Sequence, residues 1–409
     1  MSNLPSTLER VSVTRCTTAE SDAEVTRRTE EVIQSLGDYG AGLRNARKIA
    51  VKINAGIPRV VLTEGKQTEL TEPAVVEGAI RAIRAVTDAE IVIGDASTHG
   101  DGTGLYAEMG YPERLKPYKN VQLIDFGHGE LVEVEMRHSD PMFGSYMLHR
   151  QLADADAFVS VAKMKSHVSM GCTLCIKNLF GWTPWSVYGS PRVYLHDRLI
   201  RLPRVLSDLA QHFKPCLNVV DGIVALNNSE WHGEALKPGV LLAGTNIVAT
   251  DSVGARIMTF NPQGDYPNHP FFYRRNVIKL AAEAGLGPNQ PDRVEVVGVQ
   301  PEEVAVPFKV DKYDGETNRP EQLARGAECV ARYRNDRDSL VRKYPNRYLA
   351  LFDGEVLWDA PDMQTIMNLE KESGRDWQSV PQFVVKCVPE AEEIERLNTY
   401  SEEAAFAAA

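Results

Sequence analysis

The stretch KIAVKINAGIPRVVLTEGKQTELTEPAVVEGAIRAIRAVTDAEIVIGD, residues 48–95, contains the strand and helix patterns from which the fold is predicted. Residues 48–53 alternate and then become apolar, which is typical of a strand. Pro73 stands where the first turn of a helix tolerates proline, and residues 74–86 have helical spacing. A short β-branched strand follows at 91–93. A strand, a helix and a strand of these lengths predict a parallel βαβ unit.

The same alternation of strand and helix patterns continues after this unit to about residue 304. Further strands are expected at 121–126, 131–135, 157–162, 217–220, 239–243 and 293–297, and helices at 193–213 and 248–260. The pattern predicts an α/β fold with three layers, in which a mostly parallel or mixed sheet has helices on both faces. We expect an N-terminal helical extension (1–44), an α/β catalytic core of one or two lobes (45–304) and an appended C-terminal segment (305–409).

Composition narrows the class of protein. The net charge of −11 argues against broad binding to nucleic-acid phosphates, and no apolar run approaches the length of about 18 to 20 residues that a membrane span needs. The start of the chain lacks the pattern of a secretory signal. The six cysteines are scattered apart from Cys172 and Cys175, so we expect reduced thiols and a cytoplasmic protein. A homo-oligomer remains open.

The stretch VSVAKMKSHVSMGCTLCIKNLFG, residues 159–181, carries the strongest sign of chemistry. If the strand stays extended, its alternation places Lys163, Lys165 and His167 on one side. Neighbouring lysines lower one another's pKa and attract an anion, and a histidine beside them serves as a general acid or base. A helix expected to start near Cys172, and to carry Lys177, would add N–H groups to an anion site. The alternative, solvated lysines and a structural histidine, stays open.

Polar residues also follow other apolar strands. Lys52, Asn54, Asp95 and Asp221 do so, and the carboxyl ends of parallel strands meet at one edge of a sheet. We therefore expect these residues to border the same site. Asp95 and Asp221 would hold a divalent metal ion or balance the charge of the lysines. The cofactor is otherwise unknown.

At these residues the chain resembles the DUF362 family, a bacterial and archaeal group of largely unassigned function. The residues similar to its central signature are Lys163, Lys165, His167, Gly171, Thr173, Leu174, Lys177, Asn178, Phe180 and Gly181. Similar pieces elsewhere are Lys52-Ile53-Asn54, Thr71-Glu72-Pro73, Gly94-Asp95, Val220-Asp221-Gly222 and residues 249–253, so the resemblance covers roughly residues 45 to 300. The central motif is also distantly similar to the lactate racemase family, enzymes that use a nickel pincer nucleotide, although their flanking His-rich motifs are not visible.

Two departures from the family pattern bear on function. Residues 223–234, IVALNNSEWHGE, stand where many relatives have an acidic Glu-Gly-Asp-Gly-Pro loop, which implies a different substrate pocket. We expect Trp231 and His232 of this loop to contact the substrate, together with Lys52, Asn54, Thr173 and Asn178. The ferredoxin-like cysteine repeats of many relatives are absent from the sequence, so no internal ferredoxin-type iron–sulfur module is expected.

Two classes of function fit these residues. The first is an enzyme that moves a proton on a small anionic substrate, a carboxylate or a phosphate, through Lys163, Lys165, His167 and Lys177. Epimerisation, isomerisation and elimination all fit, with or without a metal. The alternative is a redox or cofactor-binding accessory protein that uses Cys172 and Cys175, although two small residues on one helix face explain this pair more simply. Asp251 is interpreted as the N-cap of its own helix.

Overall fold

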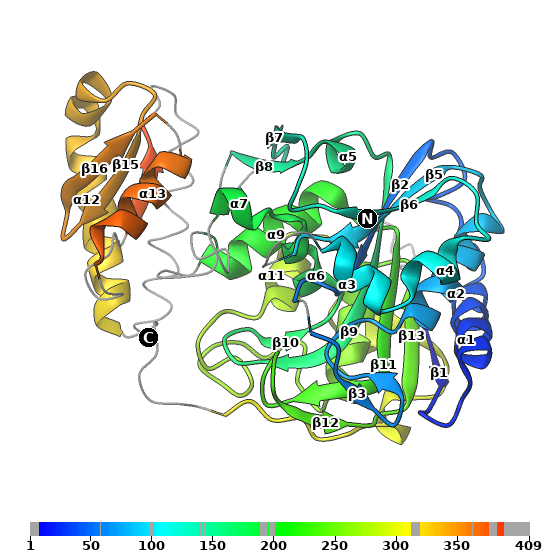
Figure 1. Ribbon diagram of the computed structural model, residues 1–409. Coiled ribbons are helices and arrows are strands. Elements are labelled where there is room, and N and C mark those ends of the chain that lie inside the picture. Colours follow the sequence, from blue (N-terminus) through cyan, green and yellow to red (C-terminus); the bar gives the residue numbers. More distant parts are fainter. Residues whose placement is uncertain are drawn as a thin grey trace, which may run out of the picture.

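The computed structural model describes residues 8–57, 59–97, 102–138, 141–142, 144–188, 195, 201–311, 320–361, 363–375 and 383–387. Its centre is a 10-stranded sheet with the main order β14-β1-β13-β11-β9-β2-β5-β6 (Figure 1). These strands are β1 (Glu9–Arg15), β2 (Lys48–Ile53), β5 (Glu90–Asp95), β6 (Val121–Asp125), β9 (Ala157–His167), β11 (Leu217–Asn227), β13 (Val240–Gly244) and β14 (Val294–Gly298).

The sheet is mixed, as predicted. Neighbouring strands from β11 through β9, β2 and β5 to β6 are parallel, whereas β13 runs antiparallel to both β11 and β1. The parallel pair β2 and β5 is the βαβ unit expected from residues 48–95. The strand expected at 131–135 is β7 (Leu131–Glu135), which pairs with β8 (Ser145–His149) outside the central sheet.

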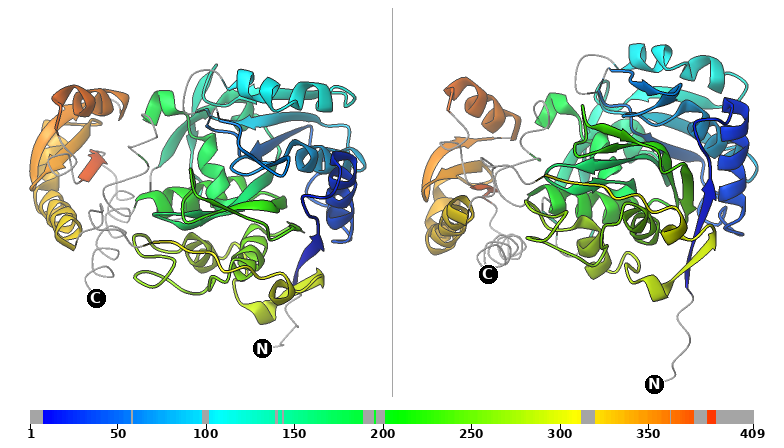
Figure 2. Two further views of the ribbon diagram at one scale, coloured as in Figure 1. Left: turned by 60° about the horizontal axis from the view of Figure 1, so that its bottom comes forward. Right: turned by 90° about the horizontal axis from the view of Figure 1, so that it is seen from below.

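Helices cover both faces of the sheet (Figures 1 and 2). One face packs against α1 (Asp22–Gln34) and α2 (Pro73–Arg84), and the other against helices that include α9 (Arg201–Phe213), α10 (Ile247–Ile257) and α11 (Val277–Glu283). Alternation along β9 divides the two cores, because Val159 and Val161 join the first and Ala162 and Met164 join the second. The fold is therefore the predicted three-layer α/β arrangement.

Two long strands, β9 and β11, extend past the ends of the strands beside them. β9 and β11 have 11 residues each, whereas the sheet strands beside them have five or six. At their far ends, β10 (Gly171–Thr173) pairs antiparallel with β9, and β12 (Glu234–Leu236) pairs antiparallel with β11. Figure 1 shows β10, β12 and β3 gathered around these ends. The extension places the end of β9, which carries the sequence motif, beside the loop that precedes β12.

Short elements make the connections. They are β3 (Leu62–Thr63), β4 (Lys66–Gln67), α3 (Thr103–Glu108), α4 (Tyr111–Leu115), α5 (Arg150–Ala153), α6 (Cys175–Asn178), α7 (Trp185–Tyr188) and the 3₁₀ turns η1 (Leu179–Trp182), η2 (Pro291–Arg293) and η3 (Pro301–Glu303). The helix expected at 193–213 is described from Arg201 as α9, and its earlier residues lie outside the described range except Leu195. No helix in the described part of the chain is both long and apolar enough to cross a membrane.

Both ends of the chain contain structure that the sequence did not indicate. The first 44 residues, expected as a helical extension, also supply β1 to the central sheet. Within 305–409, a second sheet has the order β16-β15-β17, and its elements are α12 (Pro320–Lys343), β15 (Tyr348–Phe352), β16 (Glu355–Ala360), α13 (Met363–Ser373) and β17 (Phe383–Lys386). One apolar cluster of this unit buries Cys329, Tyr333 and Leu349, whereas Ala350, Ala360 and Ile366 belong to the apolar cluster of the main body. The unit lies beside the main body in Figure 1.

Candidate functional site

Lys52 forms a buried ion pair at the end of β2. Its Nζ lies 2.9 Å from Asp95 Oδ2 at the end of β5 and donates to Asn178 Oδ1 at 3.2 Å. The backbone N–H groups of Ala55 and Ala96 donate to the two oxygens of Asp95, each at 2.8 Å. A buried charge needs this kind of compensation. Lys52, Asp95 and Asn178 thus join β2, β5 and α6 in one network.

Close packing against Lys52 and Asp95 requires a glycine at position 181 of the motif. A Cβ atom at this position would lie 1.9 Å from Asp95 Oδ1 and 2.5 Å from Lys52 Nζ. The carbonyl of Gly181 also accepts the Ala96 N–H at 2.7 Å. A residue without a side chain therefore allows η1 to close over the Lys52–Asp95 pair.

Lys163 forms a second buried ion pair, one strand away. Its Nζ lies 3.0 Å from Asp221 Oδ2 on β11 and donates to the carbonyl of Gln67 at 2.6 Å. Asp221 also accepts the N–H of Glu72 at 2.8 Å and that of Ile223 at 3.2 Å. The side chains of both partners are fully buried. This pair therefore ties β9 to β11 and to the start of α2.

The two ion pairs lie on different faces of the sheet. Lys52 is level with Ser160 of β9, three residues before Lys163. Because successive side chains of a strand alternate, Lys52 and Lys163 leave the sheet on opposite faces. Asp95 and Asp221 thus each face a lysine and do not fit a shared metal site. Within the described residues, no group of three or more His, Cys, Asp or Glu side chains is arranged to hold a metal ion.

Lys165 has a different environment from the other two lysines of the strand ends. Its Nζ lies 3.8 Å from the centroid of the Trp231 ring and 3.4 Å from Asn54 Oδ1, a contact with an amide rather than a carboxylate. Thr173 of β10 is its partner across the hairpin. Burial lowers the pKa of Lys165 to about 7, and its interaction with the charge of Glu230 offsets part of that effect. Lys165 is thus a buried amine that titrates near neutral pH.

Lys177 lies on α6, near enough to Lys165 that its positive charge further lowers the pKa of that amine. Its side chain is half-buried, and its Nζ lies 4.7 Å from the centroid of the Phe180 ring. A second cation beside a nearly neutral amine suits the binding of an anion. The structure therefore brings Lys165 and Lys177 together, while Lys163 remains with Asp221.

The helix that carries Lys177 begins at Cys175, not near Cys172 as the sequence indicated. Its first N–H groups do not add to an anion site as expected, because those of Cys175 and Ile176 both donate to the carboxylate of Asp251 at 2.8 Å. The N-cap expectation for Asp251 was also wrong, because Asn246 caps α10 and Asp251 lies within that helix. Burial raises the pKa of Asp251 to about 7.

His167 holds the turn between β9 and β10. Its Nδ1 accepts the N–H groups of Ser169 and Met170 at 3.2 and 3.3 Å. In the neutral ring this assignment leaves the proton on Nε2. The same Nδ1 lies 3.7 Å from Glu230 Oε2. The geometry is that of a hydrogen-bonded turn histidine beside the site.

Residues 228–234, which we call the strap, connect β11 to β12 and cover the end of β9. Glu230 accepts the N–H of Val168 at 3.1 Å, and Trp231 lies over Lys165. The N–H of His232 donates to Glu69 Oε1 at 2.9 Å, and Arg59 contacts both the Glu69 carboxylate and the His232 ring. Of the two residues singled out in the divergent loop, Trp231 therefore contacts Lys165, whereas His232 contacts Arg59 and Glu69.

Arg59 and Glu69 were not expected from the sequence. Glu69 is almost fully buried, and its partner His232 lies 163 residues further along the chain. No periodic pattern or local motif marks such a pair. One indication in the sequence that Glu69 is unusual is that it is the charged residue of the run Gln67-Thr68-Glu69-Leu70.

Cys172 and Cys175 are both buried and free of disulfides. They do not share a helix face, because Cys172 lies in β10 and Cys175 begins α6. Burial raises the pKa of both thiols. Since the thiolate is the reactive form, this environment disfavours redox chemistry at the pair.

The fold and the site together define an α/β protein with a lysine cluster at the carboxyl ends of parallel strands. The profile of the family described as a domain of unknown function, DUF362, matches residues 49–256, about half of the chain. The chain belongs to this family.

Two individual proteins are also similar to the chain. The thylakoid-associated protein sll1697 of Synechocystis sp. is 24% identical over 280 residues, which cover 68% of this chain and 83% of that protein. A solved structure of the lactate racemase apoprotein from Thermoanaerobacterium thermosaccharolyticum aligns with a TM-score of 0.30 at 12% identity. That alignment covers 59% of this chain and 56% of the racemase chain.

Proposed function

We propose that this protein is an enzyme that moves a proton on a small substrate bearing a carboxylate or a phosphate, with Lys165 as the proton carrier. The observation that carries the proposal is the placement of Lys165 between Trp231 and Asn54, where burial lowers its pKa to about 7. A proton-transfer group works best when its pKa lies near the operating pH. An exposed lysine, whose pKa is about 10.4, holds its proton too tightly for this role.

The remaining residues take supporting roles. Lys177 attracts the anionic group of the substrate, and its charge favours the neutral amine of Lys165. The pairs Lys52–Asp95 and Lys163–Asp221 fix the strand ends from which the site is built. Neutral Lys165 accepts the proton from the carbon beside the anionic group, and Lys177 stabilises the negative charge that develops. Epimerisation, isomerisation and elimination share this first step.

Deuterium exchange tests the proposal without knowledge of the full reaction. The protein is incubated in D2O with a panel of small 2-hydroxy acids and their phosphate esters, and deuterium at the acidic carbon is followed by NMR. We expect exchange with at least one compound and a loss of roughly 10²- to 10⁴-fold in Lys165→Met. The exchange rate should rise with pH through about 7, because the neutral amine is the base.

Lys237→Met is the matched control, since Lys237 is an exposed lysine paired with Glu64 on the surface. It should exchange at the wild-type rate. Equal rates in Lys165→Met and wild type would remove Lys165 from the mechanism. The proposal also places the enzyme in the cytoplasm, which cell fractionation tests against the thylakoid association named for the Synechocystis relative.

A further inference from the structure

Glu230 of the strap lies where several groups that attract an anion converge. Its Oε2 accepts the Val168 N–H at 3.1 Å and lies 3.7 Å from His167 Nδ1. Among charged residues, Glu230 has the largest electrostatic effect on buried Lys165. The Val168 N–H donor and the Lys165 amine, which titrates near neutral pH, form a recognition site for a carboxylate, whereas the neutral His167 ring turns an acceptor nitrogen toward it. In the structure, the carboxylate at that site belongs to the protein itself.

The strap that delivers Glu230 is held mainly by side chains. Its backbone takes left-handed conformations at Asn228 and His232, with φ of 70° and 58°, a region that residues other than glycine adopt uncommonly. The contacts that hold its centre are Trp231 on Lys165, His232 on Glu69, and Glu230 on Val168. Regular pairing with β11 resumes only at Glu234. The strap is therefore suited to release when another group takes over these contacts.

We propose that Glu230 occupies the subsite of the substrate's carboxylate, so that the substrate is a small carboxylate-bearing compound that binds by displacing Glu230 and the strap. This inference rests on the proposed function and narrows its substrate class from anions in general to carboxylates. The entering carboxylate takes the Val168 N–H and the positive charge of Lys177, beside the neutral amine of Lys165. Displacement of Glu230 exchanges one negative charge for another, so no buried cation is left uncompensated. The substrate carbon next to the carboxylate then lies near the Lys165 amine.

Binding of simple anions to Glu230→Gln tests the displacement. Glutamine keeps the shape of the side chain but loses the charge that competes with the ligand. Acetate and glycolate serve as carboxylate probes and inorganic phosphate as the other anion, with affinities measured by calorimetry on the full chain. We expect acetate and glycolate to bind Glu230→Gln roughly tenfold or more tighter than wild type, because removing an internal competitor raises the competent fraction.

Glu64→Gln is the matched control, since Glu64 is an exposed glutamate outside the strap that pairs with Lys237 on the surface. It should bind the probes as wild type does. Unchanged or weaker carboxylate binding by Glu230→Gln overturns the inference. A gain for phosphate that equals or exceeds the gain for carboxylates overturns the substrate class.

A second measurement uses the wild-type chain and so does not depend on folding of the variant. Saturating acetate should speed hydrogen exchange at the His232 amide, because the strap releases Glu69. An unchanged exchange rate on acetate binding contradicts displacement. The two proposals fail separately: loss of the acetate effects with deuterium transfer intact removes this inference alone. Intact acetate effects without deuterium transfer to any substrate remove the proposed proton transfer alone.

Discussion

Three lysines at neighbouring strand ends have different electrostatic environments. Lys52, Lys163 and Lys165 are all at most 1% exposed. Lys52 and Lys163 each face an aspartate, whereas Lys165 faces a tryptophan ring and an amide oxygen. Burial disfavours a charge, and a partner of opposite sign restores it. Tertiary position therefore gives Lys52 and Lys163 a buried carboxylate partner each and leaves Lys165 beside an aromatic ring and an amide.

The Lys163–Asp221 pair should be essential for stability. Asp221→Ala leaves a fully buried ammonium unpaired and removes the acceptor of the Glu72 N–H. Breaking a buried pair in this way costs about 3 to 5 kcal/mol. Urea denaturation measures the loss, with Lys237→Met as the control, where an exposed pair should cost about 1 kcal/mol or less. A loss in Asp221→Ala no larger than the control would contradict a structural role.

Lys165 should make stability depend on pH. The folded-state pKa is lowered from 10.5 to about 7, so between these values the unfolded chain binds more protons than the folded chain. The unfolding free energy contributed by Lys165 therefore rises with pH across this window, by up to about 1.4 kcal/mol per pH unit. Lys165→Met lacks this slope. Denaturation of both proteins between about pH 7 and pH 9 checks it, and parallel curves would rule out a lowered pKa.

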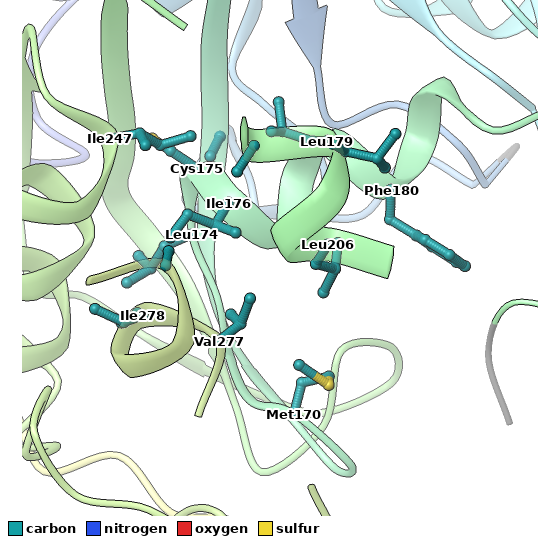
Figure 3. Close-up of a cluster of buried hydrophobic side chains, with 14 of the residues drawn as sticks. Met170, Leu174, Cys175, Ile176, Leu179, Phe180, Leu206, Ile247, Val277 and Ile278 are labelled. Atoms are coloured by element: carbon teal, nitrogen blue, oxygen red, sulfur yellow. The ribbon is translucent and has the colours of Figure 1, made fainter. Parts of the chain in front are cut away.

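At the scale of elements, α6 depends on its surroundings. A helix of four residues does not form by itself in water. Figure 3 shows Leu174, Ile176 and Leu179 among apolar side chains that include Leu206 of α9 and Ile278 of α11. Asp251 of α10 supplies the acceptors for the first N–H groups of α6. The position of Lys177 is thus set by α9, α10 and α11, not by its own segment.

Asp251→Ala should release α6 without dismantling the sheet. The variant leaves two N–H groups without their acceptor, each worth about 1 to 3 kcal/mol when buried. Faster hydrogen exchange at residues 175–178 and a lower unfolding free energy are expected. Ser252→Ala is the matched control, because the Ser252 hydroxyl donates to Val248 within the same helix. Exchange in α6 as slow as in the control would exclude capping by Asp251.

At the scale of the molecule, the main body continues past the expected boundary at residue 304. Phe308 and Val310 are buried, and the Val306 N–H donates to the carbonyl of Ile257. The Lys309 N–H donates to Asn227 Oδ1 at 2.7 Å, at the start of the strap. The segment 305–311 therefore supports the site, whereas the three-stranded unit after it packs partly in a small cluster of its own and partly against the main body.

Two shortened chains should separate these parts. A chain ending at Asp311 keeps Phe308, Val310 and the contacts to the strap, so hydrogen exchange at 227–232 should stay as slow as in the wild type, even though the contacts of Ala350, Ala360 and Ile366 with the main body are lost. A chain ending at Val304 loses two large buried side chains, worth about 1.5 to 3 kcal/mol each, and should show faster hydrogen exchange at 227–232. Calorimetry and hydrogen exchange compare the two. Equal unfolding temperatures and equal hydrogen exchange in the two shortened chains would show that the α/β core ends at residue 304.

The ends of β9 and β11 were not predicted, because these strands continue to His167 and Asn227, beyond the strands expected at 157–162 and 217–220. The parallel βαβ unit and the place of the motif at 163–181 after a strand were predicted from the sequence. These follow from local periodicity and from the rule that parallel strands present their carboxyl ends at one edge. The periodicity of residues 48–95 was sufficient for β2, α2 and β5. The sequence pattern also placed Lys165 after a strand, but it did not identify the residues that contact Lys165.

Contacts between residues far apart in the chain set which lysine is paired, where α6 begins and what covers Lys165. Asp251 lies 76 residues from the Cys175 N–H that it accepts, and Glu69 lies 163 residues from His232. Contacts at such separations leave no periodic signal. A pKa depends on burial and on nearby charges, which are properties of the folded chain. The position of the strap, with Glu230 and Trp231 over the end of β9, therefore could not be predicted from the sequence.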